Sequence, residues 1–322
     1  MHPQTPNTRH HKPKKMYHAS VLLHESVDYL GVTPGGVYVD ATFGGGGHTR
    51  LILEKLAGKG RLFAFDQDMD AQENAAAQEF AGDPAFAFVH SNFRFLKRQL
   101  RAEGLRAGSV QGILADLGVS SHQLDTADRG FSYRFQADLD MRMNQQEGAT
   151  AADILNTYNA TELQRVFSEL GEVRNSKTLA QAVLRFREQK PFKGTGDLVE
   201  LCGNNLMGER MRYLSQVFQA LRMEVNDELG ALHDFLKDAY EMLAPGGRLA
   251  IITFHSLEDR MVKNFIKAGN IEGVQQKDFY GNITRPWELV TKKPVEPSEE
   301  ELKINNRARS SKLRVAEKRS EK

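Results

Sequence analysis

The sequence predicts an α/β protein whose parallel sheet, flanked by helices, is interrupted by an inserted all-helical domain. Short apolar segments alternate with helical stretches near both ends of the chain, a pattern typical of a parallel sheet. The segment between Asp116 and Arg248 is too long for a simple crossover connection, and its pattern is helical. These observations place the insertion between the fourth and fifth expected strands.

Each expected strand is a short apolar run next to a turn or a polar residue. The first leads into a glycine-rich loop, and the second and fourth end at Asp66 and Asp116. The turn Ala244–Gly247 introduces the fifth, and the last shows period-2 alternation. The expected strands are Gly36–Ala41, Arg61–Phe65, Phe86–His90, Gln111–Ala115, Arg248–Thr253 and Lys312–Ala316.

The helical pattern divides the chain into regions. We expect a basic, disordered tail over residues 1–16, a sheet domain over 17–125 and 215–322, and the helical insertion over 126–214. A helix over Ser215–Glu224 is expected to return the chain to the sheet, and Asn226–Leu243 to lead into the fifth strand. Inside the insertion the expected helices are Ala151–Tyr158, Glu162–Glu169, Ser176–Gln189 and Leu198–Leu206.

Composition narrows the class of protein. The chain has 322 residues, of which 40% are hydrophobic, and its formal net charge is +1. Its one cysteine, Cys202, excludes an intramolecular disulfide and a cysteine-based metal site, so we expect a reducing cytoplasm. No apolar run has the length of a membrane span, and no cluster resembles a metal site. The oligomeric state, a homodimer included, stays open.

A glycine-rich loop predicts the cofactor site. Thr42–Gly47 lies between an expected strand and helix, where glycines permit a sharp turn and free N–H groups bind anions. Asp66 ends the next strand, where a carboxylate accepts both hydroxyls of a ribose. Together they indicate a nucleoside-containing cofactor. The glycine spacing does not match that of dinucleotide sites, which disfavours a nicotinamide-dependent oxidoreductase.

Several longer motifs resemble one family, the ribosomal small-subunit RNA cytosine-N4 methyltransferases known as MraW/RsmH. Two of them, in this order, are specific for the family, and the set runs along almost the whole chain. The matching segments are His18–Leu23, Thr42–Arg50, Asp116–Ser121, Gln123–Asp125, Arg129–Ser132, Leu139–Met143, Phe254–Arg260 and Arg307–Ser311.

The resemblance implies a Rossmann-like class I methyltransferase sheet that binds S-adenosyl-L-methionine. It also implies methylation of one cytidine in the decoding region of 16S rRNA, with the small ribosomal subunit as partner. Alternatives remain: a methyltransferase for another base or a small molecule, and a non-catalytic RNA-binding assembly factor. Carried over position by position, the implied cofactor contacts are Gly46, Gly47, His48, Asp66, Phe93, Asp116 and Gln123.

The chemistry of a cytosine amine requires a proton acceptor, because its lone pair is delocalised into the ring. The loop after the fourth strand is the expected source, through Asp116, Ser120 or its carbonyls; alternatively, Asp116 only holds the cofactor. His255 follows the fifth strand and is expected to reach the same crevice, unless Glu258 or Asp259 binds it.

The substrate RNA needs its own contacts. Phe131 and Tyr133 are candidates for stacking on RNA bases, or they pack the helical domain onto the sheet. The basic segment that contains Arg307, Arg309 and Arg314 is a candidate rRNA contact, with a plain basic edge as the alternative.

Overall fold

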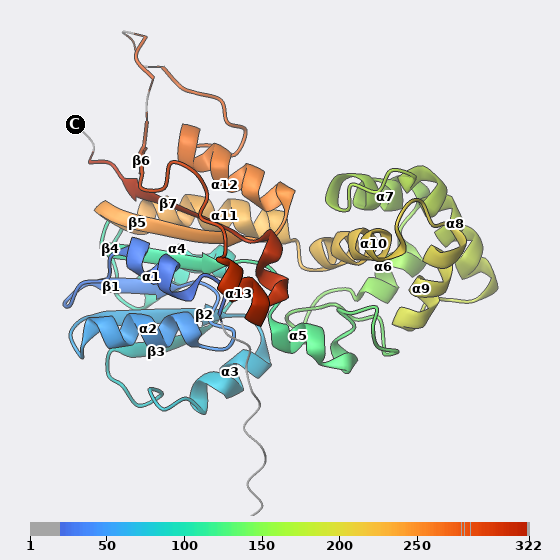
Figure 1. Ribbon diagram of the computed structural model, residues 1–322, viewed down its shortest axis with the longest axis horizontal. Coiled ribbons are helices and arrows are strands. Elements are labelled where there is room, and N and C mark those ends of the chain that lie inside the picture. Colours follow the sequence, from blue (N-terminus) through green and yellow to red (C-terminus); the bar gives the residue numbers. More distant parts are fainter. Residues whose placement is uncertain (1–19, 278, 280, 284, 321–322) are drawn as a thin grey trace, which may run out of the picture.

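A seven-stranded sheet forms the larger part of the molecule (Figure 1), in the order β3-β2-β1-β4-β5-β7-β6. The computed structural model describes residues 20–277, 279, 281–283 and 285–320, so the expected tail over 1–16 lies outside it. The first five strands of the chain run parallel, and β7 pairs antiparallel with β5 and β6. The strands are β1 (Val37–Asp40), β2 (Arg61–Asp66), β3 (Phe86–His90), β4 (Val110–Asp116), β5 (Leu243–Thr253), β6 (Trp287–Leu289) and β7 (Lys312–Lys318).

Alternating side chains build a core on each face of the sheet. In β2, Leu62 and Ala64 join one buried cluster while Phe63 and Phe65 join the other, because successive strand residues point to opposite faces. Helices α1 (Leu23–Leu30), α2 (Gly47–Leu56) and α3 (Met69–Ala76) supply the first cluster. Helices α4 (Leu96–Ala102), α11 (Glu228–Met242) and α12 (Ser256–Ala268) supply the second. The expected α/β fold class is confirmed.

Two details of the sheet differ from the expectation. Strand β5 begins at Leu243 rather than Arg248, because Leu243 pairs with Val110 before a register shift. Strand β6 was not expected: it has three residues, too few to show alternation, and it exists through its pairing with β7. Trp287 of this strand is buried against Tyr240 and Phe265.

The insertion is a group of helices with a buried cluster of its own, seen beside the sheet in Figure 1. A π-helical turn, Val166–Leu170, continues α7. Among the described residues, no helix has both the length and the apolar character needed to span a membrane. The helices are α6 (Ala151–Thr157), α7 (Ala160–Arg165), α8 (Ser176–Gln189), α9 (Thr195–Asn204) and α10 (Arg210–Val225).

Helix α10 packs differently from the expectation. Its buried residues, among them Tyr213, Val217 and Leu221, belong to the cluster of the helical insertion rather than to the sheet. The chain therefore returns to the sheet at α11 and not at Ser215. The apolar stripe of α10 has the same period in either position, so only the partner helices decide which core it joins.

Candidate active site

A cavity of about 270 Å³ opens where the carboxyl ends of the central strands face the helical insertion. Residues of α5 (Ser121–Asp125) and of the 3₁₀ turns Phe93–Phe95 and Asn306–Ser310 line it. Two further short elements, α13 (Glu299–Ile304) and the 3₁₀ turn Ala127–Arg129, contribute no lining residue. The predicted site residues that line this cavity are His48, Asp66, Phe93, Asp116, Ser120 and Gln123. Gly46, Gly47 and His255 are not among the lining residues, whereas Gly44 and Gly45 are.

A buried carboxylate, that of Asp40, holds the start of the glycine loop through hydrogen bonds. Asp40 accepts hydrogen bonds from the Thr42 amide (3.2 Å) and the Thr49 hydroxyl (2.7 Å), and its burial raises its pKa to about 6. Gly46 has φ +79°, and a Cβ there would lie 2.9 Å from the Phe43 ring, so glycine is required for the turn. The loop thereby turns Gly44 toward the cavity.

Asp66 stands at the predicted ribose position, at the end of β2. Its two oxygens accept backbone hydrogen bonds from Gly44 and Asp68, both at 2.9 Å. Burial raises the pKa of Asp66 to about 6, against the effect of these two bonds. The neighbouring wall contains Phe93, packed edge-on against Phe235 at 5.2 Å between ring centroids.

His48 starts α2 as a neutral side chain. It is buried, and desolvation lowers its pKa to about 4. Its Nε2 atom has no hydrogen-bond partner among the described residues. The ring therefore offers the cofactor pocket a neutral surface.

Ser120 and Gln123 cap helix α5. The Ser120 hydroxyl accepts from the Gln123 amide (3.1 Å), and the Gln123 side chain accepts from the Ser120 amide (3.0 Å). The side-chain nitrogen of Gln123, Nε2, donates to Asp68 at 2.7 Å. Ser120 is therefore engaged as a helix cap, which weakens its candidacy as the proton acceptor.

Asp116 differs from these residues because its carboxyl group has no hydrogen-bond partner among the described residues, and Oδ1 is fully buried. Burial, followed by the nearby charges of Asp40 and Glu258, raises its pKa well above the usual range. Its backbone amide donates to the Thr42 hydroxyl at 2.6 Å. An unpaired buried carboxyl at a cavity wall is a candidate functional group.

His255 caps α12 instead of lining the cavity. Its ring lies over Glu258, with Nε2 3.1 Å from Oε1, and Nδ1 faces the Glu258 amide at 3.5 Å. Asp259 pairs with Arg314 at 2.7 Å. This arrangement matches the alternative in which His255 is bonded to Glu258. The carboxyl of Glu258 is the group that reaches the cavity.

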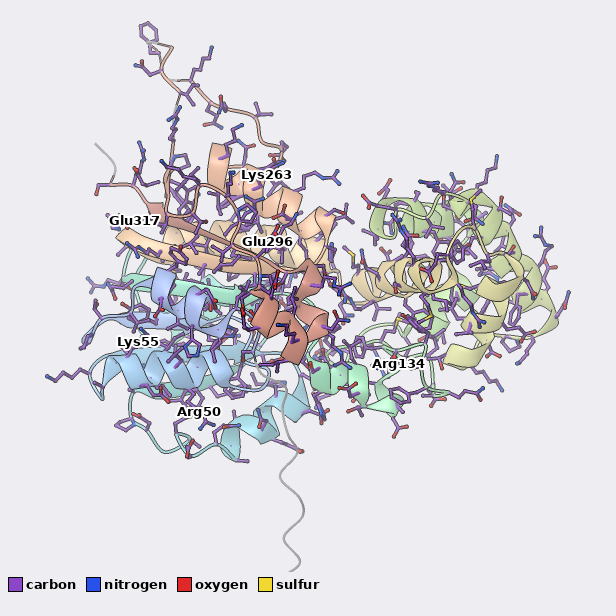
Figure 2. All side chains as sticks on the ribbon, in the orientation of Figure 1. Arg50, Lys55, Arg134, Lys263, Glu296 and Glu317 are labelled. Carbon is purple, nitrogen blue, oxygen red and sulfur yellow. The ribbon has the colours of Figure 1, made fainter. Side chains whose placement is uncertain are left out.

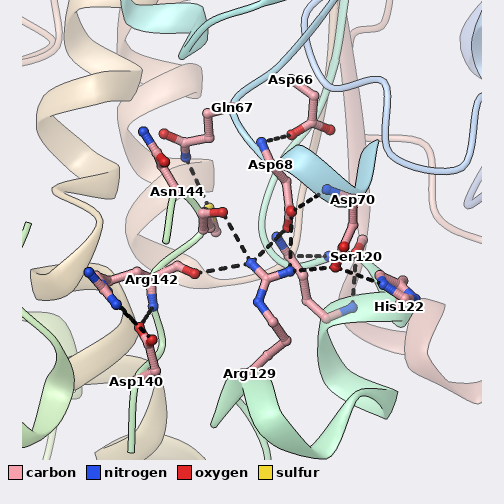
Figure 3. Close-up of polar contacts among 12 residues, drawn as sticks. Asp66, Gln67, Asp68, Asp70, Ser120, His122, Arg129, Asp140, Arg142 and Asn144 are labelled. Carbon is pink, nitrogen blue, oxygen red and sulfur yellow. Dashed lines mark hydrogen bonds and ion pairs between the residues drawn. The ribbon is translucent and has the colours of Figure 1, made fainter. Parts of the chain in front are cut away.

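A buried ion-pair cluster around Arg129 was not expected from the sequence (Figure 3). Arg129 is 3% exposed and lies 2.8 Å from Asp68 and 2.9 Å from Asp70. It also donates to the carbonyls of Arg142 and Met143, both at 3.1 Å. The cluster, hereafter the Arg129 cluster, ties the start of α3 to the first segment of the helical insertion, which precedes α6. An arginine in a motif gives no sign of partners sixty residues away.

The aromatic candidates pack in the helical insertion. Phe131 is buried in its cluster, and Tyr133 stacks edge-on against Phe218 at 5.4 Å while its hydroxyl bonds Ser215 at 3.2 Å. Both rings therefore pack within the helical insertion, and not between it and the sheet as the packing alternative held. Arg134, exposed where the two regions meet (Figure 2), pairs with Asp125 at 3.2 Å.

The basic candidates are largely paired. Arg307 lines the cavity but forms two bonds to Asp125, at 2.6 and 3.0 Å, and Arg314 is held by Asp259. Arg309 is exposed. Arg309 therefore remains the candidate of this segment with the freest access to RNA.

A third group lies between α10, α11 and α12. Arg222 donates to both oxygens of Glu228 at 2.8 and 3.0 Å, and both residues line the cavity together with Glu258. The ligand atoms of Glu228, His255 and Glu258 lie within 4.8 Å of one another, a grouping that the sequence did not suggest. Because the Arg222 guanidinium already occupies both oxygens of Glu228, we propose no metal site here.

The sheet order, the glycine loop and the acid that ends β2 together define a Rossmann-like methyltransferase. The chain belongs to the MraW methylase family, whose model matches residues 15–319. It is 51% identical over 303 residues to the ribosomal RNA small subunit methyltransferase H of Parabacteroides distasonis, covering 94% of this chain and 97% of that protein. The proteins of the same name from Flavobacterium johnsoniae (50% identical, 94% and 98% covered) and Cytophaga hutchinsonii (51%, 94% and 99%) are similarly close.

The methyl donor is S-adenosyl-L-methionine, and the residues present fit it. Gly44 and Gly45 bring bare backbone to the cavity, Asp66 stands at the position expected for the ribose, and Phe93 adds an apolar wall. No metal is needed to hold such a group.

Proposed function

We propose that the chain methylates the N4 amine of a cytidine in the decoding region of 16S rRNA, within the small ribosomal subunit. The name shared by the relatives supports the small-subunit rRNA as substrate. The observation that carries the choice of an amine is the unpartnered carboxyl of Asp116, which faces the cavity among the cofactor residues. An amine gives up a proton on methylation, and this carboxyl is free to accept it.

The bound cofactor, Asp66, the glycine loop and Asp116 would each have one role in the reaction. Bound S-adenosyl-L-methionine supplies a methyl group on a positively charged sulfur, which keeps the electron pair when the carbon–sulfur bond breaks. Asp66 and the glycine loop orient the cofactor, and the carboxylate of Asp116 accepts the N4 proton as the new nitrogen–carbon bond forms. The raised pKa of Asp116 makes its ionised form a stronger base than an exposed aspartate.

Labelled S-adenosyl-L-methionine tests the proposal, with small subunits from cells that lack the enzyme as substrate. Nucleoside digestion and mass analysis should find the label as N4-methylcytidine. Label in another nucleoside would show that the enzyme methylates a different base. Cofactor binding without methyl transfer would favour the non-catalytic assembly factor. The same assay on free 16S rRNA and on assembled small subunits shows which of the two the enzyme methylates.

A further inference from the structure

Arg222 brings a hydrogen-bond donor into the cavity from the helical insertion. It lies in the last turn of α10, and its side chain is 15% exposed. Glu228, at the start of α11, holds its Nε and Nη2 atoms. The third nitrogen, Nη1, donates no hydrogen bond among the described residues. Because the two bonds to Glu228 fix the guanidinium plane, Nη1 has a defined direction.

Hydrogen-bond acceptors line the same cavity. Asp116 ends β4, and Glu258 follows the neighbouring strand β5, where Asp116 pairs with Ile252. Glu258 accepts from the Phe254 amide at 3.0 Å, and one of its carboxylate oxygens lies within 4.8 Å of one of Glu228, the partner of Arg222. Arg222, Glu258 and Asp116 all line the cavity. The cavity therefore presents one fixed cationic donor and a carboxyl without a partner.

We propose that Arg222 selects cytosine by donating from Nη1 to ring atom N3 while the N4 amine faces Asp116. This rests on the proposed function, and it assigns the choice of base to a residue of the helical insertion. Cytosine presents a donor, N4–H, beside an acceptor, N3. Uracil presents O4 beside N3–H, so both positions would meet a group of the same kind and leave buried polar groups unpaired. An arginine cannot deprotonate to relieve the mismatch.

The test removes the contact from both sides. Wild type and Arg222→Met are compared on reconstituted small subunits that carry either cytidine or 3-deazacytidine at the target position. The deaza base lacks the N3 acceptor but keeps the N4 amine. Replacing cytidine by the deaza base should slow the wild type by about tenfold more than it slows Arg222→Met. Within one variant the ratio of the two rates is insensitive to the fraction of folded enzyme.

Two variants complete the experiment. Arg212→Met removes an exposed arginine from the same helix and should respond to the deaza base as the wild type does. Arg222→Lys keeps the charge without the fixed geometry and should fall between wild type and Arg222→Met. Equal rate ratios for wild type and Arg222→Met would overturn the role of Arg222. Failure of the wild type to methylate the cytidine substrate would instead overturn the proposed function.

Discussion

Two polar clusters border the same cavity, and they differ in how completely their groups are paired. In the Arg129 cluster the Asp68 and Asp70 carboxylates, the His122 ring and the Gln123 amide are all bonded, and among the described residues Nε of Arg129 is the one buried polar side-chain atom of the cluster without a partner. In the second cluster, which lines the same cavity, Asp116 has no side-chain partner and Arg222 keeps one nitrogen free among the described residues. Paired groups hold a structure together, whereas unpaired groups at a cavity are available to a substrate.

The largest expected effect is on catalysis. Asp116→Asn should lower methyl transfer by about 10²–10⁴-fold, the range for loss of a general base. Its thermal stability should stay the same or rise, because the change removes an unpaired buried carboxyl. Rate assays with saturating cofactor, together with direct measurement of cofactor affinity, check both. A variant that keeps its rate and loses only affinity would show that Asp116 just holds the cofactor.

The Arg129 cluster should respond in the opposite way. Arg129→Met leaves the buried Asp68 without its cation and should lower the free energy of unfolding by about 3–5 kcal/mol. Denaturant titration measures the loss. The rate per folded molecule should stay within a few-fold of the wild type; a loss as large as that of Asp116→Asn would erase the distinction between the two clusters.

Cofactor affinity should depend on pH through Asp66. With its pKa raised to about 6, the carboxylate is ionised at pH 7 and mostly protonated at pH 5, where it can no longer accept from both ribose hydroxyls. The affinity should therefore fall as pH falls, by about tenfold between pH 7 and pH 5. Calorimetric titration over this range measures it. Asp66→Asn should bind weakly with little pH dependence; an equally steep profile in that variant would assign the titration to another group.

The smallest effect is expected at Ser120. Ser120→Ala removes the cap of α5 and should cost about 1 kcal/mol of stability while methyl transfer changes little. Thermal unfolding and rate assays together decide the matter. A hundredfold loss of rate in a folded variant would restore Ser120 as a proton acceptor.

Local signals were enough to predict most of the sheet and to propose a position for the cofactor site. Alternation in β7, the glycine loop and the acids that end β2 and β4 are each readable within a few residues. Strand ends also meet by rule in a parallel sheet, so Asp66 and Asp116 were expected at one edge before any contact was known. The sequence did not predict β6, because its pairing with β7, not its own residue pattern, makes it a strand.

The roles of individual side chains depended on long-range packing. Ser120 and His255 follow strands β4 and β5, as the sequence indicates, but their hydrogen bonds make them helix caps. Arg129 lies 61 positions from Asp68 in the chain, and no local pattern announces that pair.

The sequence by itself determined the α/β architecture, the glycine loop and the acids at the strand ends, because these follow from backbone geometry and the period of nearby residues. Only the tertiary structure decided that α10 belongs to the helical insertion and that Arg222, Glu228 and Glu258 meet beside Asp116. Those residues come from three helices, and the direction of each side chain is set by what packs against it. Pairing, burial and unpaired atoms are properties of the folded chain, so they separate the structural cluster from the candidate catalytic one only after folding.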